Sequence, residues 1–262
     1  MREIKMMFRL LRASAKSQVM YKADFVIGLI GALSYNALFL ASIGIITSHF
    51  GSLGGFSAWE IVLLYAMFEI AHGLYGFALQ NMSSYLNRLV MDGTLDVYFT
   101  RPYDILTQLN GTKMNYTAFV DLFIGVACFC AVAGNAGIAW TAAKVLMIPV
   151  FAISGAFVEF SLSLVMNCGT VVSPNLRSLY GAYYQLVLIG QRYPLHLFAR
   201  GFQAIMTFIV PLGFMNYYPV LFLTDRPLGS VGLFAPAVAA LFSFMAVKVF
   251  NSTLKHYSST GN

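Results

Sequence analysis

Long apolar runs recur along this chain, and they constrain its fold more than any other feature. Several of them are long enough to cross a bilayer, whose hydrocarbon core of roughly 30 Å takes about 20 helical residues. The 262 residues are 59% hydrophobic and 10% charged, whereas about 25% of the residues in soluble domains are charged. The mean hydropathy is +0.73. The sequence therefore predicts an all-α integral membrane protein.

The apolar runs predict six transmembrane helices in a single domain, residues 1–262. The predicted spans are residues 23–47, 59–81, 116–133, 141–166, 172–193 and 228–250. Before the last span, residues 194–226 contain an apolar stretch broken by Pro211 and Pro219. This break predicts a pair of short re-entrant helices on the outer side, which is tolerated where protein surrounds the freed backbone. Alternatively, residues 195–215 form a span of their own, which would change the count.

Residues 1–22 predict an amphipathic elbow helix that lies along the cytoplasmic interface. Its basic residues recur at steps of three and four, opposite a row of apolar side chains. They are Arg2, Lys5, Arg9, Arg12 and Lys16. Such a cationic face would meet anionic lipid headgroups. A positive flank that only sets topology would explain the charge but not the two-faced spacing. We expect no cleavable signal peptide, because no uninterrupted apolar segment ends in a small-residue cleavage site.

The basic residues also predict the orientation of the spans. The six-span topology places twelve of them inside and four outside, the bias expected when both termini are cytoplasmic. The inner set is Arg2, Lys5, Arg9, Arg12, Lys16, Lys22, Arg88, Arg101, Lys113, Arg177, Lys248 and Lys255, and the outer set is Lys144, Arg192, Arg200 and Arg226. The net charge of +6 is therefore attributed to topology, and nucleic acid is not an expected partner.

Motifs for nucleotide, metal and covalent chemistry are missing from the sequence. No Gly-Lys dipeptide occurs, so there is no phosphate-binding loop of the G-x-x-x-x-G-K-[ST] type, and we expect no cofactor on this chain. The four histidines are scattered and the three cysteines lie in apolar runs, which argues against a metal site. Ser154-Gly155 resembles the end of an intramembrane serine protease motif, but Ala152 occupies its first glycine position. We expect no catalytic residues.

Four polar residues predicted at membrane depth are candidates for a translocation path: Asn36, Glu69, His72 and Glu159. Ionisable groups there are costly and usually face a protein interior or a wet cavity. Glu69 and His72 lie three residues apart on one helix face, where they can share a proton or a hydrogen bond. The alternative is that these residues only tie helices together through hydrogen bonds. Asp121 is expected near the inner surface, in contact with solvent.

The longest polar interruption, residues 83–115, follows the second predicted span and would be cytoplasmic. Its centre reads LVMDGTLDVYFTRPYD. Residues 94–100 predict a short amphipathic helix whose apolar side carries Leu95, Tyr98 and Phe99, and the Arg-Pro pair that follows would end it. A solvated loop would not need three large apolar side chains in this space. We therefore assign a contact with a partner protein to Asp92, Gly93, Leu95, Asp96, Tyr98, Phe99, Arg101 and Pro102.

This stretch resembles the G-x-L-D-x-[YF]-x-x-[RK]-P pattern that follows the second span in permease subunits of ABC type-2 exporters, in particular their small six-span bacterial branch. The matching residues are Gly93, Leu95, Asp96, Tyr98, Arg101 and Pro102. The Tyr-Pro, Val-Pro and Tyr-Pro series between residues 193 and 219 is similar to the outer re-entrant region of the same family.

The resemblance implies a multi-pass permease of the bacterial cell membrane, with a coupling helix between its second and third spans. It implies a dimer of identical or paralogous permeases, embedded in membrane lipids and bound to two cytoplasmic ATPase subunits that carry ATP and Mg²⁺. The cargo is left open. Two alternatives are a proton-coupled secondary transporter, with Glu69, His72 and Glu159 as the relay, and a polytopic lipid-modifying enzyme. The enzyme is disfavoured because no catalytic set converges.

Overall fold

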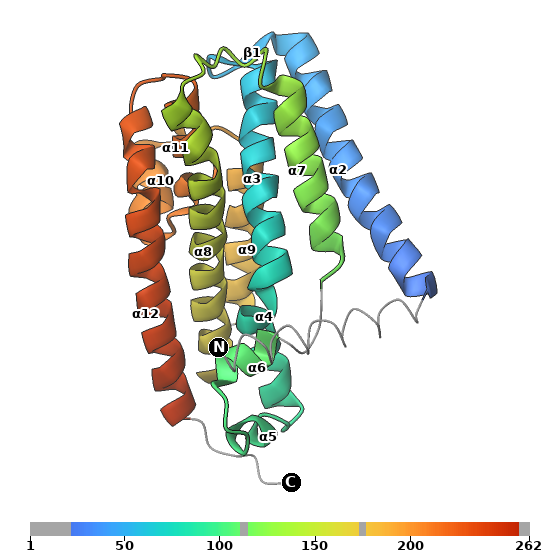
Figure 1. Cartoon of the computed structure of the whole chain (residues 1–262), viewed down its shortest axis with the longest axis vertical. Helices are drawn as coiled ribbons and strands as arrows, with labels where there is room; N and C mark the ends of the chain where they lie inside the picture. Colours follow the sequence, from blue (N-terminus) through green and yellow to red (C-terminus); the bar gives the residue numbers. More distant parts are fainter. Residues whose placement is uncertain (1–21, 111–114, 173–176, 257–262) are drawn as a thin grey trace.

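The computed structural model is a bundle of long helices and describes residues 22–110, 115–172 and 177–256 (Figure 1). Its longest helices are α2 (Lys22–Phe50), α3 (Ala58–Ala78), α8 (Ala142–Val172) and α12 (Ala235–Lys255). The shorter helices α7 (Thr117–Val132) and α9 (Arg177–Arg192) run alongside them. The predicted elbow helix, with Arg2, Lys5, Arg9, Arg12 and Lys16, lies outside the described residues.

Four of the described helices are long and apolar enough to cross a membrane, or five if one bent helix pair counts as a single span. The four are Val26–His49, Ala58–Ala78, Ala142–Gly169 and Gly229–Lys255. With 16 residues each, α7 and α9 rise only about 24 Å. That is less than the roughly 30 Å of a hydrocarbon core. The all-α class and the multi-pass character are confirmed, whereas the count of six spans is not.

A small hairpin joins α2 to α3 at one end of the bundle, which we call the hairpin end (Figure 1). Strands β1 (Ser52–Leu53) and β2 (Phe56–Ser57) pair antiparallel across a Gly-Gly turn whose φ angles are +60° and +79°, a conformation that favours glycine. Ser57 then caps α3: its side chain accepts from the Glu60 N–H, and the Glu60 carboxylate accepts from the Ser57 N–H at 2.8 Å.

The apolar stretch before α12 is bent, as the sequence predicts. Its first arm is α10 (Arg200–Ala204) continued by η3 (Ile205–Ile209), its second arm is η4 (Leu212–Phe214) with α11 (Tyr217–Leu223), and the arms meet at 76°. Pro211, which has no N–H, lies at the break. Pro219 does not break α11, because it lies in the first turn, where an N–H has no partner within the helix. Residues 195–215 therefore do not form one continuous helix.

Both arms of the bent pair lie in the half of the bundle that carries the hairpin (Figure 1). The remaining elements are η2 (Leu195–Leu197), η5 (Gly229–Phe234), α4 (Gln80–Met91), α5 (Asp96–Phe99) and α6 (Ile105–Asn110). The last three lie at the opposite end, which we call the α5 end. The bundle thus has one end closed by the hairpin and the bent pair, and one end formed by a polar segment.

Two ion pairs hold the hairpin end together. The guanidinium of Arg226 donates to both carboxylate oxygens of Glu60, at 2.6 and 2.9 Å, and to the carbonyl of Gly55 at 2.7 Å. Lys144 Nζ lies 2.6 Å from Asp225 Oδ2. The bidentate contact between Arg226 and Glu60 belongs to the stronger class of polar contacts in proteins. Two of the four basic residues predicted outside are therefore neutralised by carboxylates of the same chain.

The Arg226→Ala substitution is expected to lower the stability of the bundle, because it leaves the buried Glu60 carboxylate without its cation. Hydrogen bonds to charged groups contribute about 2 kcal/mol, so the melting temperature of the protein in detergent should fall measurably. Arg200→Ala is the matched control, since Arg200 is exposed and pairs with no carboxylate among the described residues. Equal melting temperatures for the two variants would contradict this role.

Helix α3 is the centre of the bundle, in contact with α2, α7, α8 and α9. Its approach to α7 is close enough to require glycine. A Cβ atom on Gly73 would lie 2.6 Å from the backbone nitrogen of Leu122, and one on Gly125 would lie 2.7 Å from that of Ile70. Small residues at such crossings let helix backbones pack closely in membranes. The interface of α3 with α7 therefore depends on these two glycines.

Candidate functional site

The polar segment at the α5 end consists of α4, α5 and α6 (Figure 1). Helix α4 ends at Met91, and Gly93, with φ at +64°, turns the chain. The predicted break before residue 94 is thus present. The short helix is also present but covers Asp96–Phe99 rather than the seven predicted residues, with Leu95 at its start.

The apolar side chains of this segment point in two directions. Leu95 is fully buried and packs in a cluster that includes Leu89 of α4 and Phe160 of α8. In contrast, Val97 is 50% and Phe99 49% exposed, and we call these two residues the exposed pair. The sequence grouped Leu95 with Phe99 on one apolar side. The structure separates them, because Leu95 is buried in the bundle while the side chain of Phe99 is about half exposed.

A buried glutamine fixes the geometry between α5 and α6. The side-chain amide of Gln108 donates to the carbonyls of Tyr98 at 3.1 Å and Tyr103 at 2.8 Å. Partial burial raises the pKa of the Tyr98 hydroxyl, and the guanidinium of Arg101 lies 5.5 Å from the centre of its ring. Side-chain hydrogen bonds therefore connect the two sides of the α5–α6 turn.

The other residues assigned to the coupling contact lie on the surface of this segment. Asp92 Oδ2 is 3.5 Å from Arg88 Nε on the preceding turn, and both side chains are more than half exposed. Asp96, Arg101 and Pro102 are exposed as well. A partner at the α5 end would therefore meet a mixed surface of charged side chains around the exposed pair.

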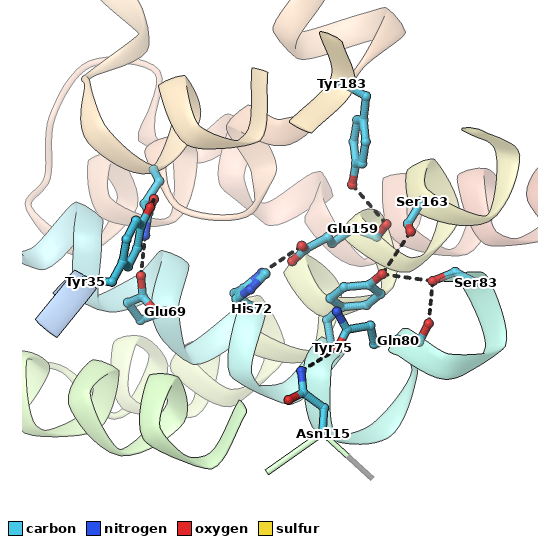
Figure 2. Close-up of polar contacts among 11 residues, drawn as sticks. Tyr35, Glu69, His72, Tyr75, Gln80, Ser83, Asn115, Glu159, Ser163 and Tyr183 are labelled. Carbon is cyan, nitrogen blue, oxygen red and sulfur yellow. Dashed lines mark hydrogen bonds and ion pairs between the residues drawn. The ribbon is translucent and has the colours of Figure 1, made fainter. Parts of the chain in front are cut away.

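The four path candidates from the sequence lie in one connected region of the bundle. Figure 2 shows His72 of α3 reaching Glu159 of α8, with 2.7 Å between Nδ1 and Oε1. Glu69 accepts a hydrogen bond from the Gln191 side chain of α9. Asn36 of α2, the fourth candidate, accepts from the hydroxyl of Tyr65.

A hydrogen bond between Glu69 and His72, which the sequence allows, is not found among the described residues. Although the two side chains share a face of α3, each forms its hydrogen bond with a different neighbouring helix. Glu69 pairs with Gln191 of α9, and His72 pairs with Glu159 of α8. In Figure 2, Glu69 and Tyr35 accordingly lie on one side of His72, and Glu159 lies on the other. The pair therefore bridges three helices instead of forming a local contact.

A second polar network, which the sequence did not suggest, lies between these residues and the α5 end. The hydroxyl of Tyr75 lies 2.8 Å from Ser83 Oγ of α4 and donates to Ser163 Oγ of α8 at 2.9 Å (Figure 2). Asn115 donates to the side chain of Gln80 at 2.5 Å. The available signal was the spacing of Tyr75, three residues after His72 on α3. The network ties α3, α4 and α8 together where α3 gives way to the polar segment.

A cavity of about 370 Å³ lies between α2, α3, α7 and α9. We call it the acidic cavity, because Glu69 and Asp121 line it together with His72. Asp121 was expected near the inner surface. It lies in the second turn of α7, where it is half-buried, lines this cavity and accepts a hydrogen bond from Asn36 at 3.2 Å.

A second cavity, of about 410 Å³, lies nearer the hairpin end and is mainly apolar, with Ile43 and Arg192 among its lining residues. Tyr35 lines both cavities and donates to Gln191 Oε1 at 3.1 Å. This contact between α2 and α9 marks the boundary between the two cavities. The sequence predicted neither Tyr35 nor Gln191, because single neutral polar residues in apolar helices are ordinary.

Comparison with known proteins gives one result. The model of a family described as ABC-2 family transporter protein matches residues 33–261. No curated protein and no solved structure matches the chain. The matched residues include most of those that line the acidic cavity, the polar segment at the α5 end and the bent helix pair.

Proposed function

Because this chain belongs to the ABC-2 family of transporter membrane proteins, we propose that it is the permease subunit of an ATP-driven exporter. Members of the family generally work with ATPase partners. The observation that carries the proposal is the family match together with a polar segment at one end of the bundle, held by the Gln108 hydrogen bonds, that carries exposed apolar side chains.

The proposed complex contains two permeases, identical or paralogous, and two cytoplasmic ATPase subunits that bind ATP and Mg²⁺. The missing phosphate-binding loop in the 262 residues supports a separate ATPase chain. The excess of basic residues on one side supports a bacterial cell membrane location with both termini and the α5 end in the cytoplasm. In this arrangement α7 and α9 are short spans, the bent pair is re-entrant from outside, and residues 1–22 form the elbow helix.

In this proposal the α5 segment is the coupling element. The exposed pair, Val97 and Phe99, docks in a cleft of the ATPase, and Leu95 carries the resulting movement into the bundle because it belongs to the same buried apolar cluster as residues of α4 and α8. The Tyr75 network continues this connection along α3 and α8. Closure of the ATPase subunits would then rock the two permeases and open a path between them.

A proton-coupled secondary transporter is the second candidate. It is favoured by one observation: the His72–Glu159 pair, at 2.7 Å, lies next to the carboxylate of Glu69 within the membrane-spanning part of the bundle. Ionisable groups at such depth often form proton relays. In the exporter, the same pair would stabilise the packing of α3 against α8.

Inside-out vesicles that contain the permease with its co-purified ATPase distinguish the two functions without knowledge of the cargo. The vesicles are incubated with a small-molecule extract of the source cells, and mass spectrometry identifies compounds that accumulate inside. We expect accumulation with ATP and none with a non-hydrolysable ATP analogue. Accumulation by the permease alone under a proton gradient would instead establish the secondary transporter.

A further inference from the structure

The acidic cavity contains carboxylates that lack a cation. Glu69 is only 2% exposed, and its one hydrogen-bonding partner among the described residues is the neutral amide of Gln191. Its second oxygen therefore accepts no hydrogen bond from them. Asp121 likewise receives only the amide of Asn36. A buried carboxylate without a paired cation is costly, so Glu69, and to a lesser degree the half-buried Asp121, favours a positively charged ligand.

The basic residues near the cavity do not satisfy this charge. His72 is the only basic side chain among the described lining residues, and its Nδ1 is held by Glu159 at 2.7 Å. With every group ionised, the three carboxylates Glu69, Asp121 and Glu159 face one imidazolium, which leaves a net charge of −2. Arg192 lines the neighbouring cavity on the far side of Tyr35.

The shape and lining of the cavity indicate an organic cation rather than a metal ion. Its volume of about 370 Å³ is that of a small-molecule site. Phe68, Tyr35 and Tyr184 add aromatic surface to the lining, which attracts ammonium groups. Among the described residues, no three His, Cys, Asp or Glu side chains are placed to hold a metal ion.

We propose that the acidic cavity binds a small aromatic or aliphatic ammonium ion, whose charge lies between Glu69 and Asp121. The proposal adds a cargo class to the exporter function. It rests on that function only in taking the bound cation to be the cargo. Binding itself needs no ATPase. The site is therefore tested separately from transport.

Gly31 provides a way to fill the cavity without changing any charge. It lines the cavity, and a Cβ atom there would have no neighbour within 4 Å. Gly31→Leu should therefore occlude the site while the bundle still folds. Gly44 lies on the same helix, is exposed and also has open space around it, but it lines neither cavity. Gly44→Leu is thus the matched control.

The experiment measures equilibrium binding of radiolabelled benzyltrimethylammonium to the purified full chain in phosphatidylcholine nanodiscs. We expect saturable binding that neutral neopentylbenzene and anionic benzoate do not displace. The Glu69→Gln/Asp121→Asn double substitution should weaken binding by about tenfold or more, because two charge-assisted contacts are lost. Gly31→Leu should abolish it, and Gly44→Leu should leave it unchanged.

Absent binding to the wild type would overturn the proposal, as would displacement by benzoate or equal affinity in Gly31→Leu and Gly44→Leu. Melting temperatures identify variants that fail to fold. If the Glu69→Gln/Asp121→Asn variant fails to fold, the comparison of Gly31→Leu with Gly44→Leu decides whether the cavity binds the cation. Binding as predicted without ATP-driven accumulation would leave the site standing and remove the exporter function. ATP-driven accumulation together with unaltered binding in Gly31→Leu would support the exporter function and remove the proposed site.

Discussion

Substituting Gly125 by valine is expected to prevent assembly of the bundle. The new Cβ would lie 2.7 Å from the backbone nitrogen of Ile70 and 2.9 Å from the Cβ of Glu69. Neither helix backbone can yield locally, so α3 and α7 must separate. Overpacking of this kind costs about 3 kcal/mol or more, and because α7 and α3 both line the acidic cavity, its shape would be lost too. Size-exclusion chromatography in detergent should show little monodisperse protein.

The control for this substitution is Gly44→Val, which introduces the same side chain on the exposed face of α2, where a Cβ meets nothing within 4 Å. It also shows whether a β-branched residue in a helix is itself harmful. We expect wild-type yield and melting temperature. If Gly125→Val and Gly44→Val behave alike, the close approach of α3 and α7 does not determine the fold.

Replacing both members of the exposed pair, Val97→Asp with Phe99→Asp, is expected to separate the permease from its ATPase while the bundle stays intact. Both side chains are about half exposed, so their charge is tolerated in the free protein, but it would be buried in the proposed interface. Central apolar contacts contribute about 2 kcal/mol or more, which corresponds to roughly thirtyfold weaker binding. Affinity purification measures how much ATPase stays bound to the permease, and ATP hydrolysis by the purified complex measures whether the two remain coupled.

Two further variants show whether such a loss is specific. Ser52→Asp adds a charge at the exposed hairpin end and should leave ATPase binding unchanged. Leu95→Ala removes a fully buried side chain and should lower the melting temperature, because emptied core sites cost about 3 kcal/mol. If the double substitution retains the ATPase with full hydrolysis, the coupling assignment is wrong.

The long helices were predictable because an apolar run has few options in a membrane. The predicted spans over residues 23–47 and 59–81 correspond to α2 and α3, with ends that differ by a few residues. Helix α3 stops before Asn81 because Leu79, at φ −129°, interrupts it. The short, more polar helices were harder to assign as spans, since a run of 16 residues is compatible with a span, an interfacial helix or a core helix.

For the polar residues, the sequence indicated which positions are unusual but not which partners they contact. Glu69, His72 and Glu159 were identifiable because charges inside apolar helices are unusual and need partners. Which partners they take was not predictable, since it depends on how α8 and α9 are rotated against α3. For the same reason, the pattern around Leu95 indicated an apolar side without showing that Leu95 faces the bundle and Phe99 faces outward. Local sequence specifies the periodicity of a helix, but packing decides what each face meets.

The most direct test of the central claim is a cross-link from the α5 segment to an ATPase. Phe99 is replaced by photoreactive benzoylphenylalanine, membranes of the source cell that contain the full complex are illuminated, and the products are identified by mass spectrometry. The same substitution at Ser52 on the hairpin end serves as the control. We predict an adduct between position 99 and an ATPase subunit and none from position 52. Adducts from position 99 only to lipid, or an ATPase adduct from position 52, would contradict the coupling role of this segment.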